Sequence, residues 1–511
     1  MDYQFNPEHI FKVVQMFPYK TTIKLNKSLK EPVYLQLANQ LILLIREGNL
    51  TPGTKLLGSR ILADLLGIHR KTVVACYEEL TLQGWIESFP KKGTFVNTKL
   101  PNTQRIDFKT TESSPLKQKT GFPFYKNKVL LEKKTEKKEG VIYINDGTSD
   151  TRLTPTNEIA RTYRRIVSRK SIHKYLDYGS PYGNIKLRET LVEYLNDTRG
   201  LNISKENVLI TRGSQMGMWL STQLLLTQDD IVVVGETNYS SADITFLHQN
   251  AEIKRVSVDE NGLVTNEIEK LCRKDLIKAV YVTSHHHHPT TVTLSAERRI
   301  HLLQLAQKYN FAIIEDDYDY DFNYDHAPIL PLASHDTYGN VIYIGSVCKT
   351  VAPVFRIGYL IASKDFINEA AKLRGYVDRQ GDALLELAFA DFIKSGDLDR
   401  HIRKVLKVYL QRRDLFCKLL QTELGDFFQF KIPKGGMAIW LQLHQKYSWE
   451  EVAIEAKKHQ LEIGEWQRYD LANKKHNAIR VGFASYNKEE IVLLIDKLKN
   501  TLISLKNKER L

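Results

Sequence analysis

Gly345-Ser-Val-Cys-Lys-Thr-Val-Ala-Pro-Val-Phe-Arg-Ile-Gly-Tyr359 is the stretch of sequence that decides the fold. It follows an apolar run, 341–344, that is typical of a buried strand, and it sets Lys349 close behind that strand. A lysine at the end of a buried strand is costly unless its amine has a chemical task. Ser346 and Arg356 flank the lysine, and a hydroxyl and a guanidinium are groups that bind phosphate. The stretch therefore predicts an amine held beside a phosphate site.

Three more apolar runs precede this one, with helix-length segments between them. The four runs are 231–234, 279–282, 311–314 and 341–344. Strands that alternate with helices are typical of an α/β layer fold with a mainly parallel sheet. We expect this fold over residues 141–511, with ligands bound at the carboxyl ends of the strands.

Length and composition limit the class of protein. A chain of 511 residues is long enough for about two to four domains. The sequence contains no run of ~20 uncharged apolar residues, as a membrane helix needs, and no secretory signal at its start. The four cysteines are far apart and lack metal-ligand spacing, which favours a reducing compartment. We therefore expect a cytoplasmic protein without a membrane span.

Positive charge is concentrated at the N-terminal end. Residues 1–100 carry 13 Lys and Arg against 8 Asp and Glu, and residues 101–140 carry 10 against 5. A basic end on a nearly neutral body is typical of a polyanion-binding module joined to a globular partner. Residues 98–140 are themselves polar and Lys-rich, and we interpret them as a solvated linker.

A compact helical unit is expected over residues 31–97. Leucines and isoleucines with helical spacing fill 34–46. Ser59 is suited to cap a second helix, which Gly67 ends, and a third helix covers 69–80. Two short helices joined through a glycine, the second of which opens with basic residues, are typical of a helix-turn-helix.

The last helix of this unit and the β-hairpin predicted after it carry the residues that we expect to bind double-stranded DNA. Polar side chains in the first turn of such a helix reach base edges and phosphates in a major groove, and a basic hairpin tip forms a wing. The alternative is that these charges only line a solvated helix face. The predicted contacts are His69, Arg70, Lys71, Thr72, Lys91 and Lys92.

Several motifs of this unit closely resemble the GntR-type winged helix. They include Pro52-Gly-Thr-Lys-Leu56, Arg70-Lys-Thr-Val-Val74 and Gly93-Thr-Phe-Val96. The resemblance implies that residues 1–97 are a DNA-binding domain. It also implies DNA contacts by Arg60, Arg70, Thr72 and Gly93.

The body, residues 141–511, carries the groups that pyridoxal 5'-phosphate requires. Lys349 is the candidate for the Schiff base, because burial or a neighbouring cation lowers the pKa of its amine. The phosphate needs backbone N–H groups at a helix N-terminus, with hydroxyl and guanidinium groups beside them. The ligands that we expect are Gly213, Ser214, Gln215, Ser346 and Arg356.

An acidic strand end, Glu315-Asp-Asp-Tyr-Asp319, supplies the remaining cofactor contacts. Asp316 is the expected partner of the protonated pyridine nitrogen, and Tyr318 is the expected partner of the ring hydroxyl. Tyr239 is expected to border the ring, although a tyrosine of the core fits its pattern equally well. The acid cluster by itself also fits a divalent cation, and the presence of Lys349 favours the pyridoxal phosphate interpretation.

These motifs resemble fold-type I aminotransferases, and their order over 142–511 resembles the aminotransferase-like domain of MocR-type regulators. Matching motifs are Tyr178-Gly-Ser-Pro-Tyr-Gly183 and Arg356-Ile-Gly-Tyr359. The resemblance implies a homodimer, and it implies that Arg480 binds the carboxylate of an amino-acid-like ligand. From the residues alone, Arg480 fits a structural ion pair equally well.

Some positions depart from the family pattern. Cys348 stands where the family has serine, as either a reactive thiol or a small packing residue, and Val354 replaces a glycine. Four histidines, 285–288, stand where the family has a Pro-Ser-His-Gln-aromatic-Pro-x-Gly loop. In that register His286 matches the family histidine and is a predicted cofactor contact. Four histidines also suggest a metal site, but adjacent residues cannot all point at one ion, and we predict none.

Together, these features predict a transcription regulator whose body senses a small amino compound. The amine of the ligand would displace Lys349 by aldimine exchange, Arg480 would hold its carboxylate, and the change would alter DNA binding by the two heads of a dimer. One alternative is an active pyridoxal phosphate-dependent aminotransferase with an attached DNA-binding domain. Another is a repressor whose body is only a dimerisation scaffold, against which Lys349, Asp316, Tyr318 and Arg356 argue together.

Overall fold

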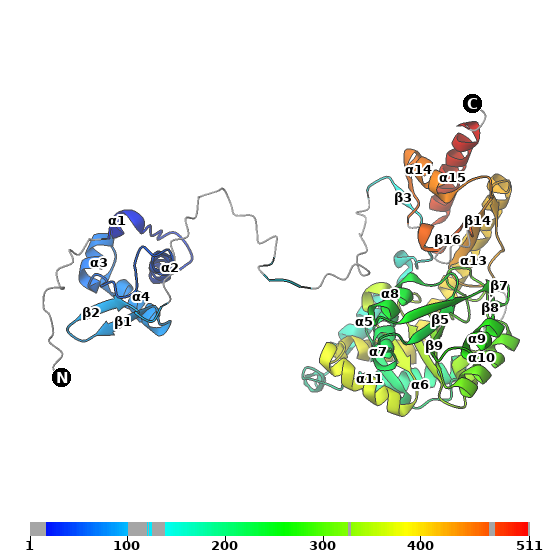
Figure 1. Ribbon diagram of the computed structural model, residues 1–511, viewed down its shortest axis with the longest axis horizontal. Coiled ribbons are helices and arrows are strands. Elements are labelled where there is room, and N and C mark those ends of the chain that lie inside the picture. The colour runs from blue at the N-terminus through cyan, green and yellow to red at the C-terminus, as the bar shows by residue number, and fades with distance from the viewer. Residues whose placement is uncertain are drawn as a thin grey trace. The chain divides into compact units, whose positions relative to one another are not determined.

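The chain forms two compact units, Met1–Tyr125 and Lys126–Leu511, in the computed structural model (Figure 1). The predicted linker, 98–140, lies mostly outside the described residues, and the bounds of the three predicted regions stay predictions. The structure describes residues 17–100, 120, 122–124, 138–324, 329–464, 466–469 and 476–508.

The first unit is a small helical domain with a β-hairpin. Leu37, Leu41, Leu62, Val73 and Leu80 are fully buried in one core that all its long helices share. The predicted helices and hairpin are confirmed within one or two residues. Its elements are α1 (Tyr19–Thr22), α2 (Val33–Arg46), α3 (Ser59–Leu66), α4 (Arg70–Leu82), β1 (Ile86–Phe89) and β2 (Gly93–Val96).

The turn between α3 and α4 depends on Gly67, which ends α3 in the left-handed region at φ 61°. A glycine adopts this conformation without steric cost, as predicted from the sequence. The prediction that Ser59 caps α3 is wrong. Gly58 is the capping residue, Ser59 is the first residue of the helix, and its hydroxyl accepts a hydrogen bond from Arg70 Nε at 3.4 Å.

A seven-stranded sheet with the order β4-β12-β11-β10-β9-β5-β6 forms the centre of the second unit. The four apolar runs predicted as strands are its adjacent members β11, β10, β9 and β5, and each neighbouring pair among them is parallel. β12 is antiparallel to both of its neighbours. The mainly parallel sheet is thereby confirmed. The strands are β4 (Val208–Thr211), β5 (Ile231–Gly235), β6 (Glu252–Val256), β9 (Ile277–Val282), β10 (Ala312–Asp317), β11 (Val341–Ser346) and β12 (Gly358–Ile361).

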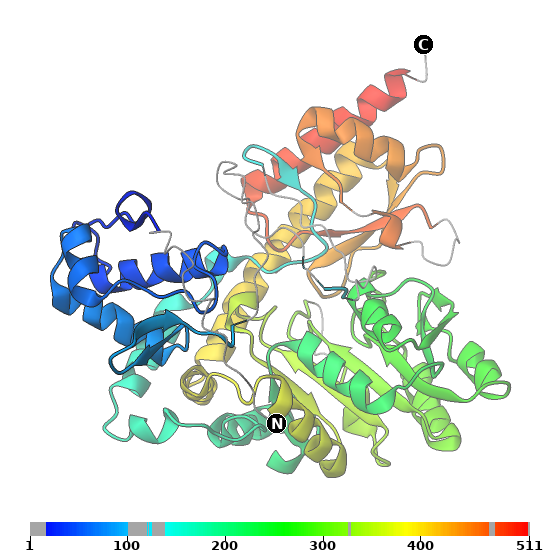
Figure 2. The ribbon, with the colours of Figure 1, turned by 60° about the vertical axis from the view of Figure 1, so that its left-hand side comes forward.

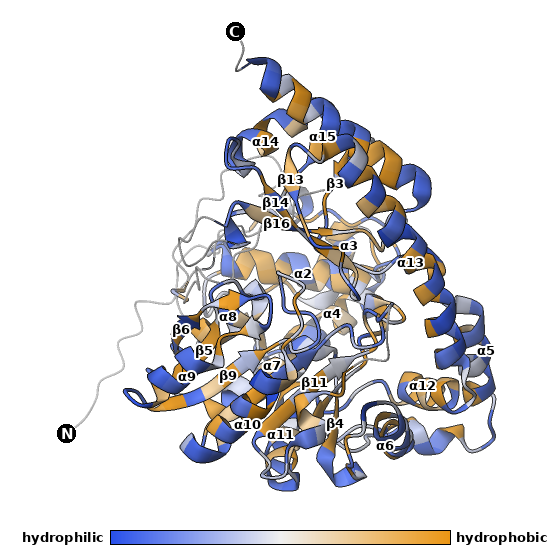
Figure 3. Ribbon diagram, turned by 90° about the vertical axis from the view of Figure 1, so that its right-hand side faces the viewer, coloured by the Kyte–Doolittle hydropathy of each residue, from blue (hydrophilic) through white to orange (hydrophobic). Residues whose placement is uncertain are grey.

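Helices cover both faces of this sheet, because successive strand residues point in opposite directions. On β11, Ile342 and Ile344 pack with α7 (Ser214–Leu225) and α8 (Ser240–His248), whereas Val341 and Tyr343 face the other side. Figure 3 shows the consequence in the body, where the sheet strands are largely orange and α13 (Asp397–Leu424) has separate orange and blue faces. None of the helices in the described ranges combines the length and the apolar character needed to cross a membrane.

A smaller antiparallel sheet, β13-β14-β16, belongs to the C-terminal part of this unit. Its strands are Phe428–Gln429, Ala438–Leu443 and Ala478–Gly482, and α15 (Lys488–Lys508) packs with α13 beside it. The first strand of the body joins this part rather than the large sheet. β3 (Ile142–Tyr143) pairs in parallel with β15 (Leu461–Glu462), as the cyan segment beside the orange and red elements in Figure 2 shows.

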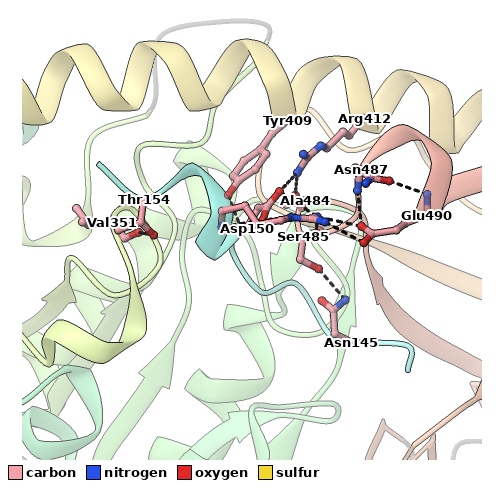
Figure 4. Close-up of polar contacts among 11 residues, drawn as sticks. Asn145, Asp150, Thr154, Val351, Tyr409, Arg412, Ala484, Ser485, Asn487 and Glu490 are labelled. Carbon is pink, nitrogen blue, oxygen red and sulfur yellow. Dashed lines mark hydrogen bonds and ion pairs between the residues drawn. The ribbon is translucent and has the colours of Figure 1, made fainter. Parts of the chain in front are cut away.

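Polar contacts hold the residues that follow β3 (Figure 4). The backbone N–H of Asp150 donates to Tyr409 Oη at 2.9 Å, and Arg412 Nη1 lies 2.9 Å from the Asp150 carboxylate. Arg152 reaches Glu490 on α15 at 2.9 Å. The entry segment, which we define as residues 142–154, is therefore fixed to both long helices of the C-terminal part.

Candidate functional site

A cavity of about 220 Å³ lies at the carboxyl ends of β5, β9, β10 and β11 and at the start of α7. The topology brings these strand ends to one edge of the sheet, where open α/β sheets bind their ligands. Nine of the predicted site residues line it: Ser214, Gln215, Tyr239, Asp316, Tyr318, Ser346, Lys349, Arg356 and Arg480. Five residues that the sequence did not single out as contacts complete the lining: Asp146, Tyr281, Thr283, His288 and Cys348.

Lys349 is half-buried, and its amine faces the entry segment. Its Nζ donates a hydrogen bond to the carbonyl oxygen of Gly147 at 2.6 Å. Burial lowers the pKa of Lys349, because the charged amine loses its hydration, and the nearby Asp146 carboxylate opposes this shift. A lowered pKa favours the neutral amine, which is the nucleophilic form.

Asp316 has one satisfied and one unsatisfied oxygen. Oδ2 accepts a hydrogen bond from Tyr281 Oη at 2.9 Å, whereas Oδ1 is buried and has no partner in the part of the chain that the structure describes. Burial raises the pKa of Asp316 to about 7. A buried oxygen without a donor is costly, and the protonated ring nitrogen of pyridoxal phosphate would supply that donor.

Residues that could bind a phosphate line the same cavity. Gly213, at φ 78°, precedes the first residue of α7, so backbone N–H groups of the helix start face this space. A Cβ at Gly213 would lie 2.8 Å from the guanidinium of Arg356. Ser214, Ser346 and Arg356 line the space. These polar groups and the Asp316 oxygen that has no hydrogen-bond partner among the described residues line one cavity, and together they fit pyridoxal phosphate.

Arg480 is fully buried beside Lys349, and its donors bind neutral oxygens. Nε donates to Asp146 O at 2.7 Å, Nη1 to Pro289 O at 3.2 Å, and Nη2 to Tyr318 Oη at 3.2 Å. Among the described residues, no carboxylate makes an ion pair with it within 4.0 Å, so the structural ion pair considered from the sequence is not found there. Its charge is available to a carboxylate in the cavity.

The four consecutive histidines point to different partners. His286 Nδ1 lies 2.9 Å from Asp319 Oδ1, and His287 Nδ1 lies 3.0 Å from Thr290 Oγ1. His288 lines the cavity, with Nε2 3.5 Å from Asp146 Oδ2. His286 is a predicted cofactor contact that the structure does not bring to the cavity, because its ring is occupied by Asp319. In the described ranges, no three potential ligands form a group that could hold a metal ion.

Tyr239 and Cys348 both reach the cavity. The ring of Tyr239 meets that of His288 edge-on, with centroids 5.1 Å apart, so Tyr239 borders the cavity while it also packs against the core beneath α7 and α8. Cys348 Sγ lies 3.9 Å from Arg356 Nη1. The thiol therefore sits beside a predicted phosphate ligand, where the family pattern has a serine hydroxyl.

The predicted DNA contacts lie on the surface of the first unit. Arg60, His69, Arg70 and Thr72 line one open hollow of about 770 Å³. The exposed residues Lys71, Lys91, Lys92 and Gly93 lie outside this hollow, the last three of them at the hairpin tip. Lys27 and Asp64, which the sequence did not single out, also line the hollow.

Comparison with known families identifies both units. Residues 142–503 match the family model "Aminotransferase class I and II", and residues 33–96 match "Bacterial regulatory proteins, gntR family". The chain therefore belongs to the class I and II aminotransferase family, and it carries a regulatory helix-turn-helix domain at its other end.

Relatives over nearly the whole length are regulators by name. The chain is 26% identical to the "Uncharacterized HTH-type transcriptional regulator YdeL" of Bacillus subtilis, over 93% of this chain and 98% of that protein. It is also 26% identical to the "Probable rhizopine catabolism regulatory protein MocR" of Rhizobium meliloti, over 81% and 82%. The kynurenine aminotransferase of Pyrococcus horikoshii, solved with PMP, covers 71% of this chain and 91% of its own with 27% identity and a TM-score of 0.67.

These matches confirm four predictions. The fold is that of fold-type I aminotransferases behind a winged helix-turn-helix, and the resemblance to MocR-type regulators holds over the chain. Transcription regulation is the function class that the two-domain relatives share. Pyridoxal 5'-phosphate is the cofactor of the family.

Proposed function

We propose that this protein regulates transcription in the cytoplasm by sensing a small amino compound that carries a carboxylate. The observation that carries the proposal is one cavity lined by a lysine amine, by an Asp316 oxygen without a hydrogen-bond donor and by the Arg480 guanidinium without an ion-pair partner, the last two as judged within the described ranges. The lysine would react with the cofactor in competition with the ligand amine, Asp316 would bind the cofactor ring, and Arg480 would bind the ligand carboxylate. The DNA-binding unit on the same chain makes a sensor a better interpretation than a stand-alone catalyst.

The residues divide the work of binding. When bound, pyridoxal phosphate supplies an aldehyde carbon that reacts reversibly with amines. Asp316 holds a proton between its carboxylate and the ring nitrogen, and the start of α7 with Arg356 binds the phosphate. Arg480 orients the ligand by its carboxylate. Lys349 and the ligand amine then compete for the same position.

The entry segment is suited to transmit this competition. Asp146 O accepts from Arg480 at 2.7 Å, and Gly147 O accepts from Lys349 at 2.6 Å. Arg480 and Lys349 both change partners when a ligand binds. The hydrogen bonds of two adjacent carbonyl groups, those of Asp146 and Gly147, therefore change together. The chain enters the body through this segment on its way from the DNA-binding unit. We infer that the ligand shifts a two-state equilibrium of the entry segment, which alters DNA binding.

A homodimer is supported by exposed apolar side chains on the second unit. Tyr376 is 93% exposed, Val354 78% and Tyr178 76%. The guanidinium of Arg379 lies 4.7 Å from the Tyr178 ring centroid, which joins two of these segments into one surface. We propose that a second copy covers this surface, so that two DNA-binding units act as a pair.

The test is a titration of the cofactor-loaded protein with a panel of amino acids and amines. Cofactor absorption and binding to a promoter fragment are recorded together. A regulator changes its DNA affinity at the ligand concentration that changes the absorption. Steady consumption of ligand with a keto acid, without a change in DNA affinity, would instead favour the aminotransferase alternative.

A further inference from the structure

The residues just before the regulatory family match form an arm along α2, which we define as residues 23–31. Gln36 is buried, and its amide holds the arm: Oε1 accepts from Asn26 N at 2.9 Å, and Nε2 donates to Asn26 O at 3.0 Å and to Glu31 O at 2.8 Å. Gln40 binds Lys24 N and Lys24 O in the same way, at 2.8 and 2.7 Å. Two glutamine amides on one helix face thus satisfy the arm's backbone as a neighbouring strand would.

A turn in this arm presents Lys27 at a fixed place. The side chain of Asn26 accepts from Ser28 N at 2.9 Å, an Asx turn that orients the residue between them. Lys27 lines the same hollow as Arg60 of α3 and Arg70 of α4. Within the described residues, its amine has no ion-pair partner.

The charges around Lys27 favour an anion. Asp64 is the acidic residue that lines the hollow, against the cations of Lys27, Arg60 and Arg70. The carboxylate of the arm, Glu31, is turned to α2, where Asn39 Nδ2 donates to it at 2.9 Å. Three cations from three separate elements therefore converge on one open surface.

We propose that Lys27 binds a backbone phosphate of DNA and that Gln36 is the positioning residue that keeps it there. This inference rests on the proposed DNA binding of the first unit. A lysine binds phosphate as a point charge and reads no base, so the contact is independent of sequence. Because Gln36 and Gln40 already fix the backbone of the arm, little backbone conformational entropy is lost when Lys27 binds the phosphate.

The experiment measures the affinity of the full-length protein for a mixed-sequence 30-base-pair duplex at several salt concentrations. Each phosphate contact contributes about 0.9 to the slope of log K against log salt. Lys27→Gln is therefore expected to reduce the slope by about 0.9 for each DNA-binding unit on the duplex, and for one unit the wild-type advantage shrinks about 3.5-fold between 50 and 200 mM salt. Lys30→Gln removes the same charge from the same arm, outside the hollow, and is expected to keep the wild-type slope.

A second variant tests the positioning role. Gln36→Met removes the clamp, and in combination with Lys27→Gln it is expected to add no further loss of affinity. An unchanged slope in Lys27→Gln, or fully additive losses in the double variant, would overturn the inference. If the wild-type protein itself fails to bind the duplex at low salt, the DNA-binding function fails, which is a different result from failure of Lys27.

Discussion

The hollow of the first unit and the cavity of the second are both lined by cations that suit an anion. The two sets of cations differ in their exposure to solvent. In the hollow, Arg60 and Arg70 are exposed to solvent. In the cavity, Arg480 is buried and Lys349 is half-buried, and they donate to carbonyl oxygens at 2.7 and 2.6 Å. Exposed cations suit a long polyanion, because each contributes a salt-dependent contact. Buried cations suit one small ligand, because their low-dielectric surroundings strengthen each contact and shift pKa values.

The largest effect is expected at the buried amine. Lys349→Ala should abolish retention of pyridoxal phosphate through dialysis, because the covalent attachment point is gone. Absorption of the dialysed protein measures this. Lys372→Ala is the matched control, since Lys372 is exposed and paired with Glu369 at 2.6 Å. Retained cofactor absorption in Lys349→Ala would show that the buried amine is not the attachment point.

Asp316→Asn should separate stability from cofactor binding. The folded-state pKa of about 7 lies above the ordinary value, so the folded protein holds a proton that the unfolded chain releases between about pH 4 and 7. Stability of the cofactor-free protein is therefore lost as the pH rises through this window. The free energy of unfolding of the variant should exceed that of wild type by about 2–4 kcal/mol at pH 8, which raises its melting temperature, and the difference should be smaller at pH 4.

The same variant should bind pyridoxal phosphate less tightly, because the ring nitrogen loses its acidic partner. Asp317→Asn is the control, since the Asp317 carboxylate accepts from Tyr343 and does not line the cavity. Thermal melts with and without cofactor measure both effects. Equal loss of cofactor affinity in the two variants would contradict the role assigned to Asp316.

Arg480→Gln should weaken ligands that carry a carboxylate. Charge-assisted hydrogen bonds contribute about 1.5–3 kcal/mol, so the expected loss is about 10- to 150-fold for an amino acid. The corresponding amine without a carboxylate should be affected little. The comparison of the two ligands by absorption titration is the measurement, and equal losses would mean that Arg480 is structural.

The smallest effect is expected in the hairpin. Gly93 has φ 111°, a conformation that residues with a side chain rarely adopt, so Gly93→Ala should destabilise the first unit by about 1–2 kcal/mol. Gly58→Ala is the comparison and should cost less, because Gly58 has φ −59°, its Cβ would meet no atom within 4 Å, and only the preference for glycine over alanine at the helix cap is lost. Calorimetry of the whole chain should show a shift of one transition and leave that of the body in place. Equal shifts in the two variants would contradict the strain at Gly93.

The sequence predicted those parts of the site that lie at strand ends. Apolar runs identified β5, β9, β10 and β11, and the residues that follow these strands include Tyr239, Tyr318 and Lys349. Asp146 was missed because it lies about 200 residues before Lys349, and local pattern carries no signal of a contact at that separation. His288, rather than His286, lines the cavity, because the backbone points the side chains of consecutive histidines in different directions.

The sequence also did not predict which residue caps α3. Ser59 has the residue type of a cap, but the helix begins with it, since Gly58 takes the non-helical conformation at ψ 147°. The sequence did not single out Gln36 and Gln40, because their role depends on the arm that lies beside them.

The most direct measurement follows the DNA affinity of the cofactor-loaded protein while an amino compound changes its absorption. We predict that both signals share one midpoint and that Lys349→Ala removes both responses while it keeps the DNA binding of the ligand-free state. A change in absorption at constant DNA affinity would contradict the account, because the buried site and the exposed one would then be independent.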